Sequence, residues 1–102
     1  MANPLTKGLR PVHPGEMLRE DILPAVGRPK TEIARLLGIS RQTLYDILNE
    51  KQPVTPAMAL RLARMFGGSA ESWVNMQRNY DLKIAERELA AELDKIPHLE
   101  AA

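Results

Sequence analysis

Apolar residues recur every three or four positions along most of this chain, and no segment alternates strictly between apolar and polar residues. The first spacing is typical of amphipathic helices, whereas strict alternation would indicate half-buried strands. Residues that favour helix ends interrupt the apolar stripes at several points. The pattern therefore predicts an all-α fold of five helices, the last of them long.

The first two predicted helices are short. Pro14 suits the first position of a helix, and Pro24 together with Gly27 is expected to end that helix. The second helix is expected to begin with Thr31 as its N-cap and to end before Gly38. Its expected buried side consists of Ile33, Ala34, Leu36 and Leu37.

Three further helices are predicted downstream. The third extends from the favourable N-cap Ser40 to about residue 49, and its apolar stripe has the spacing i, i+3, i+4. The fourth begins at Thr55-Pro56, a cap followed by proline in the first helical position. The fifth is expected to run from the cap Ser69 as far as Ile96, with Trp73 as an anchor in the core.

The stretch 30–49, KTEIARLLGISRQTLYDILN, has the spacing of a helix-turn-helix unit. Ala34 is small where the two helices would cross, and Gly38 can adopt the left-handed conformation that ends the first of them. In such a unit the second helix enters the major groove of DNA, so its outward side chains are the expected readers. The predicted base-reading residues are Ser40, Arg41, Gln42, Tyr45 and Asp46.

The chemistry of these side chains suggests individual roles. Arg41 can donate two hydrogen bonds to guanine, and Gln42 can pair in the same way with adenine. Tyr45 can offer its ring to a thymine methyl group, whereas Asp46 would either accept from cytosine or orient Arg41. Charge and the positive end of a helix favour phosphate contacts from a second predicted set: Lys30, Thr31, Thr43, Asn49 and Lys51.

The number of readable base pairs bears on the assembly. One copy would read only about four or five base pairs, too few to find a single genomic site. A homodimer on a palindromic double-stranded operator is therefore expected, with half-sites about one helical turn apart.

The charges are divided unequally along the chain. Residues 1–66 hold 10 Lys and Arg against 6 Asp and Glu, whereas residues 67–102 hold 4 against 7. The body is therefore basic and suited to a phosphate surface, and the remainder is acidic. The predicted domain organisation is a flexible N-terminal arm (1–12), a helix-turn-helix core (13–68) and a C-terminal helix that continues the core (69–102).

Other functional classes find little support in the sequence. The chain has no cysteine, and its two histidines, His13 and His98, lie far apart without nearby ligands, so no metal and no cofactor are expected. No serine lies in a nucleophile motif, and no enzymatic activity is expected. No apolar run reaches the roughly 18 residues that cross a bilayer, and no signal peptide is apparent, so a cytoplasmic location is expected.

An apolar stripe continues into the acidic C-terminal part beyond the needs of a core of this size. It consists of Leu82, Leu89, Leu93 and Ile96, with Ala85 or Glu86 between them. Two interpretations remain open: the stripe contacts a second copy or another protein, or the helix folds back over its own domain.

Four segments together span about residues 13–85: HPGEMLREDILPAVG, the 20-residue unit above, TPAMALRLARMFGGSAESW and NMQRNYDLKIA. These segments resemble the HigA/VapI group of antitoxins within the phage-repressor-like (XRE/Cro/cI) helix-turn-helix family. Two positions depart from the family pattern. Glu50 follows Asn49 where Asn-Gly is common, and Lys83 stands where an aromatic residue is common.

The resemblance implies a DNA-binding antitoxin that neutralises a small HigB-like ribonuclease toxin and represses its own operon. One alternative is a protein-interaction module that masks a toxin, with DNA binding secondary, since an acidic helix could cover the site of a basic ribonuclease. Another alternative is a free-standing repressor without a toxin.

Overall fold

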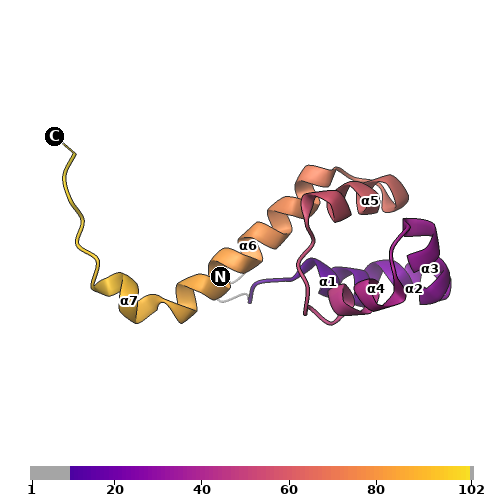
Figure 1. Ribbon diagram of the computed structural model, residues 1–102, viewed down its shortest axis with the longest axis horizontal. Helices are drawn as coiled ribbons and strands as arrows, with labels where there is room; N and C mark the ends of the chain where they lie inside the picture. The colour runs from indigo at the N-terminus through magenta and orange to yellow at the C-terminus, as the bar shows by residue number, and fades with distance from the viewer. Residues whose placement is uncertain (1–9, 102) are drawn as a thin grey trace.

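A computed structural model describes residues 10–101, and that part of the chain is helical without any β-strand (Figure 1). The predicted all-α fold is therefore confirmed. Most of the predicted arm, residues 1–9, lies outside the described residues, and residues 10–13 form no regular element. The elements are α1 (Pro14–Met17), the π-helical turn η1 (Leu18–Ile22), α2 (Leu23–Val26), α3 (Lys30–Leu37), α4 (Arg41–Leu48), α5 (Pro56–Phe66), α6 (Ala70–Glu88) and α7 (Ala90–Asp94).

Residues 14–26 form one continuous helical stretch that passes through Pro24. The expectation that Pro24 helps to end this helix is wrong. A π-helical turn precedes the proline, and the N–H of Leu23 donates to the carbonyl of Leu18 five residues earlier. Pro24 then stands in the first turn of α2, where a missing N–H costs little. The helix ends at Gly27, whose φ of 73° is the left-handed conformation expected there.

The helices α3 and α4 form the predicted helix-turn-helix unit. Gly38 ends α3 with a φ of 77°, and Ser40 caps α4. Two expectations about α3 are wrong. Pro29, not Thr31, is its N-cap residue, and Leu36 is 49% exposed because the buried face is centred on Ile33, Ala34 and Leu37.

The core lies between the helix-turn-helix unit, α1 and the pair α5 and α6. Thr55 caps α5 through its side chain, and Ser69 does the same for α6, both as predicted. Trp73 of α6 is only 4% exposed and belongs to this core, which confirms its predicted role as an anchor. The apolar core is made of Leu18, Leu23, Ile33, Ala34, Leu37, Leu44, Ile47, Leu48, Val54, Met58, Ala59, Leu62 and Trp73.

The C-terminal part leaves the body of the molecule and extends away from it (Figure 1). The expected single helix to Ile96 is interrupted: α6 ends at Glu88, Leu89 links the two helices, and α7 follows. Every residue from Glu86 to Ala101 is exposed, so only local hydrogen bonds hold this part of the chain, without support from packing. Among the described residues no helix is both long and apolar enough to cross a membrane.

Candidate nucleic-acid interface

Helix α4 has one buried face and one polar face. Leu44, Ile47 and Leu48 are each at most 2% exposed and fix the inner face against the core. On the opposite face, Arg41, Gln42 and Tyr45 are exposed. The fold therefore brings the predicted base-reading residues together on the outer side of one helix. Whether they contact bases remains a prediction.

Ser40 has a structural task at the start of this helix. Its Oγ accepts a hydrogen bond from the backbone N–H of Thr43 at 3.0 Å and donates to the Thr43 hydroxyl at 2.8 Å. These bonds satisfy an N–H at the helix start that would otherwise have no partner. Ser40 is exposed and Thr43 is half-buried, so this pair of hydroxyls lies at the edge of the polar face.

Asp46 is linked to Gln42 across one turn of α4. The Nε2 of Gln42 donates to Oδ1 of Asp46 at 2.8 Å. The sequence left open whether Asp46 orients Arg41 or accepts from a base, and the structure supplies a third arrangement. With its amide nitrogen held by Asp46, Gln42 presents its Oε1 and one remaining N–H outward.

The predicted phosphate-binding residues lie around α4 on three elements. Lys30 and Thr31 occupy the first turn of α3, whose N-cap Pro29 provides no side-chain cap. Asn49 ends α4, and its N–H donates to carbonyls of that helix. Lys51 follows in an exposed loop, where its N–H donates to the carbonyl of Asp46 at 2.8 Å.

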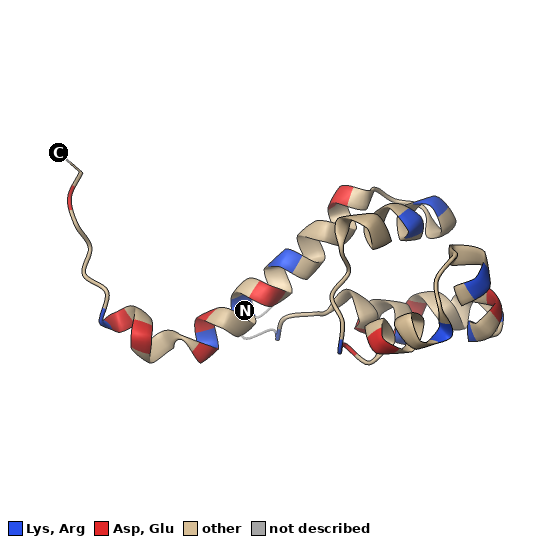
Figure 2. Ribbon diagram, viewed as in Figure 1, with Lys and Arg blue, Asp and Glu red and all other residues tan. Residues whose placement is uncertain are grey.

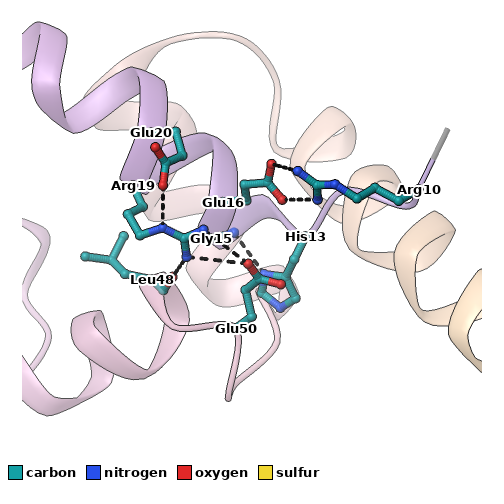
Figure 3. Close-up of polar contacts among 8 residues, drawn as sticks. All are labelled: Arg10, His13, Gly15, Glu16, Arg19, Glu20, Leu48 and Glu50. Atoms are coloured by element: carbon teal, nitrogen blue, oxygen red, sulfur yellow. Dashed lines mark hydrogen bonds and ion pairs between the residues drawn. The ribbon is translucent and has the colours of Figure 1, made fainter. Parts of the chain in front are cut away.

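Arg19 of η1 holds the C-terminal end of α4 (Figure 3). Its guanidinium donates to the carbonyl of Leu48 and lies 3.4 Å from the carboxylate of Glu50, while its Nε donates to Glu20 at 2.8 Å. A cation at this point also complements the negative end of the helix. Arg19 thus connects the first helical stretch to the helix that carries the polar face.

The turn after α4 is strained at one residue and tied to α6. Glu50 has a φ of 62°, a conformation that a non-glycine residue adopts at a cost. Farther along the turn, the N–H of Val54 donates to Oε1 of Gln77 at 2.8 Å. Gln77 is 6% exposed and also donates to Asp81 at 3.0 Å, so a buried side chain of α6 holds this loop.

His13 caps α1 from a buried position. Its Nδ1 accepts from the N–H of Gly15 at 2.9 Å, and its ring meets that of Tyr80 edge-on with centroids 5.0 Å apart. The pKa of His13 is lowered because burial disfavours the charged imidazolium, and this effect outweighs the opposite effect of the nearby carboxylates of Glu50 and Asp81. The neutral imidazole is the form that can accept this bond.

Sequence reasoning assigned no role to Arg19 or Gln77 and identified no task for His13. Arg19 and Leu48 are 29 residues apart, and Val54 and Gln77 are 23 apart, so no local periodicity links either pair. The sequence held two signals near these contacts: Pro14 directly after His13, and Glu50 at a position where glycine is common in the family. Within residues 10–101 no cluster of three or more potential metal ligands exists.

The residues predicted to contact a second copy or a toxin lie away from α4, on the C-terminal extension, the part of the chain that leaves the body of the molecule. Leu82 is 56% exposed on α6, Leu89 links the last two helices, Leu93 lies on α7, and Ile96 follows it. The interpretation that the helix folds back over its own domain is wrong for these residues, because all four are exposed. Their contact with another chain remains a prediction.

A core with a capped helix-turn-helix and an outward polar helix face is typical of DNA-binding regulators of the helix-turn-helix class. A family model described as Helix-turn-helix matches residues 18–73, and the chain belongs to this family. Virulence-associated protein I of Dichelobacter nodosus is 44% identical over 89 residues, covering 86% of this chain and 82% of that protein.

Solved structures give the same result. Antitoxin GraA superposes with a TM-score of 0.84 at 38% identity, and the match covers 90% of this chain and the whole GraA chain. Antitoxin HigA of Pseudomonas aeruginosa, solved with the higBA promoter, gives 0.83 at 36% identity over 89% of this chain and all of its own. GraA in complex with its operator gives 0.83. The expected membership in the HigA/VapI group is confirmed.

Proposed function

We propose that this protein is an antitoxin that binds operator DNA through α4 and represses its own operon. The exposed polar face of α4, opposite the buried stripe of Leu44, Ile47 and Leu48, is the observation that carries this proposal. Relatives of the same fold were solved with a promoter and with an operator, which supports DNA binding by this chain. The helix would enter the major groove with Ser40 at its leading end.

The side chains on this face have distinct proposed tasks. Arg41 would donate to guanine, and Tyr45 would contact a thymine methyl group. Gln42 and Asp46 would act as a linked pair, because their hydrogen bond fixes which atoms of the amide face outward. Ser40 would contribute through its position at the helix start, since its hydroxyl is engaged with Thr43.

The phosphate contacts would fix the register of the protein on DNA. Lys30 at the start of α3 and Lys51 in the loop after α4 carry exposed charges, and Thr31 lies at a helix start without a side-chain cap. Thr43 and Asn49 mark the two ends of α4 and would reach the backbone beside it. Such contacts add affinity without sequence preference.

The exposed apolar stripe supports two further proposals about partners. Leu82, Leu89, Leu93 and Ile96 would contact a second copy or a HigB-like ribonuclease toxin, because exposed leucines on a long extension favour a protein contact. A dimer would place two α4 helices on the half-sites of a palindrome. The toxin is proposed on the strength of the named antitoxin relatives.

DNA binding is tested by mobility shift and footprinting on the region upstream of the protein's own reading frame. A footprint of two half-sites, with affinity that falls steeply as salt increases, is expected. The matched control is the double variant Arg41→Ala/Gln42→Ala, which should fold normally and lose the footprint. Failure of the purified protein to shift this DNA would refute the repressor part of the proposal.

The exposed acidic extension favours a second candidate, a protein-interaction module in which DNA binding is secondary. Coexpression with the product of the adjacent reading frame distinguishes the two. If the protein is an antitoxin, its coexpression should restore the growth of cells that produce the toxic neighbour. A chain that ends after Glu88 tests whether the apolar stripe beyond that residue is required for this protection. Restored growth without any footprint would favour the interaction module, whereas a footprint without a toxic neighbour would favour a free-standing repressor.

A further inference from the structure

Helices α3 and α5 lie at the end of the molecule remote from α7 (Figure 1). A groove between them has a volume of about 570 Å³ and is lined by Leu36, Leu37, Leu60, Arg61, Arg64 and Met65. Leu36 is 49% exposed and Leu60 is 65% exposed. Large exposed apolar side chains beside cations are typical of a surface that binds another protein segment.

The two charged residues that line this groove are both arginines. Helix α5 carries Arg61 and Arg64 and no acidic residue (Figure 2). Arg61 donates to the carbonyl of Leu37 at 2.6 Å, whereas Arg64 forms no ion pair with any residue in the described range 10–101. The groove therefore suits an acidic, apolar segment and would repel a basic protein. Its apolar floor does not suit nucleic acid.

The chain itself contains a segment of this chemistry, residues 89–99, which we name the tail. Leu89, Leu93 and Ile96 follow the spacing of one helix face, and all are exposed. Glu92 and Asp94 lie between them. Residues 86–101 hold 5 acidic residues against 2 basic ones, which complements the arginines of α5.

The tail cannot reach the groove of its own chain, since α6 separates them by 19 residues, roughly 28 Å of straight helix. A second copy can bring the two together. A hollow on the flank of α6 is lined by Val54, Val74, Leu82 and Ala85 together with the polar residues Gln77, Arg78 and Asp81, and this flank is the surface on which two copies would pack about a two-fold axis.

The direction of the helices decides which parts of the two copies meet. Helix α5 lies beside α6 and precedes its start at Ala70, whereas the tail follows its end at Glu88. In an antiparallel pair of α6 helices, the C-terminal end of one helix lies next to the N-terminal end of the other. This arrangement brings the tail of one copy toward α5 of the second copy.

We propose that the tail of one copy docks into the α3–α5 groove of a second copy, and that the exchange is reciprocal. The acidic side chains of the tail lie against Arg64, and its leucines and isoleucine cover Leu36 and Leu60. This inference rests on the dimer proposed above and goes further, because it names the surface that receives the tail.

Crosslinking tests the contact directly, since the chain has no cysteine of its own. Leu60→Cys and Ile96→Cys chains, coexpressed with different tags, should form a mixed disulfide under mild oxidation. The control replaces Leu60→Cys by Ala57→Cys, an exposed position on the first turn of α5 outside the groove. The groove pair should crosslink at least about tenfold faster, and equal rates would overturn the proposal.

Charge reversal gives a second readout by analytical ultracentrifugation without DNA. Arg64→Glu should raise the Kd of the dimer about tenfold or more, and Glu92→Lys/Asp94→Lys in the same chain should restore it. Arg35→Glu makes the same charge change on an exposed residue outside the groove and should have little effect.

The outcomes separate this inference from the proposed function. A monomeric native chain contradicts the dimer and the docking together. A dimer that tolerates Arg64→Glu and shows no preferential crosslink contradicts only the docking of the tail. Groove substitutions that weaken toxin binding and leave the dimer intact would assign the groove to the toxin and overturn the proposal.

Discussion

Gly15 of α1 lies directly against the backbone carbonyl of Ile47 in α4. A Cβ atom at position 15 would be 1.8 Å from that oxygen, far inside any permitted contact. The first helical stretch therefore approaches the polar-faced helix more closely than any residue with a side chain allows. This contact, together with the bond from Arg19 to Leu48, fixes where α4 lies relative to the rest of the core.

The substitution Gly15→Ala should displace α4 and lower the free energy of unfolding by about 3 kcal/mol, because backbone atoms cannot yield as a flexible side chain can. Urea denaturation measures the loss. Gly27→Ala is the control: unlike Gly15, Gly27 has a positive φ, and nothing lies within 4 Å of an added Cβ. Its cost should be about 1 kcal/mol. Equal losses at the two positions would refute the close contact.

Because Glu50 lies in a strained turn, we expect Glu50→Gly to be more stable than Glu50→Ala, the reverse of the order found in a helix. Glu50→Gly and Glu50→Ala both remove the ion pair with Arg19, so they differ only at the backbone. At a φ of 62°, glycine should be more stable than alanine by about 1 kcal/mol. In a helix the order is the opposite. Chemical denaturation of both variants at pH 7 decides between these orders.

His13 should make stability depend on pH below neutrality. Its pKa in the folded state is lowered by burial, so the unfolded chain, with an ordinary imidazole pKa of about 6.5, takes up the proton first. The contribution of neutral His13 to the free energy of unfolding is complete above about pH 6.5. It is lost as the pH falls from about 6.5 toward the pKa of His13 in the folded state. The slope is at most about 1.4 kcal/mol per pH unit.

Unfolding free energies at pH 7.5, 6.5 and 5.5 measure this dependence. His13→Asn keeps an acceptor for the N–H of Gly15 but cannot titrate, so its curve should be flatter than that of the native chain in this range. His98→Asn removes the other histidine from an exposed position and should leave the curve unchanged. A His13→Asn curve parallel to the native one would exclude His13 as the cause.

Arg41 and Lys51 should respond differently on DNA. Arg41→Ala should relax preference at one base position and leave the others intact, because it removes a contact to a base edge. Lys51→Ala should weaken binding to all sequences alike and reduce the slope of log K against log salt by about 1. Selection from a randomised site library and salt titration measure both effects. Equal effects from the two variants would contradict the assignment of roles.

Local pattern was enough to predict most of the helices. The caps Ser40, Thr55 and Ser69 and the ends at Gly27 and Gly38 were all predicted, because each depends on residues within one turn of the helix end. The errors also have local causes. A π-helical turn lets the helix continue past Pro24. The predicted buried face of α3 was too wide, because it included Leu36, which is exposed.

The candidate interface divides in the same way. The outward face of α4 follows from the period of its apolar stripe, so Arg41, Gln42 and Tyr45 could be named from the sequence. The contacts that hold that face in position, such as Arg19 with Leu48, join residues far apart in the chain. A periodicity of 3.6 carries no information about such pairs, since packing of separate helices creates them. Helix identity and polarity are thus local properties, whereas the position of α4 and the groove beside α5 depend on how the helices pack.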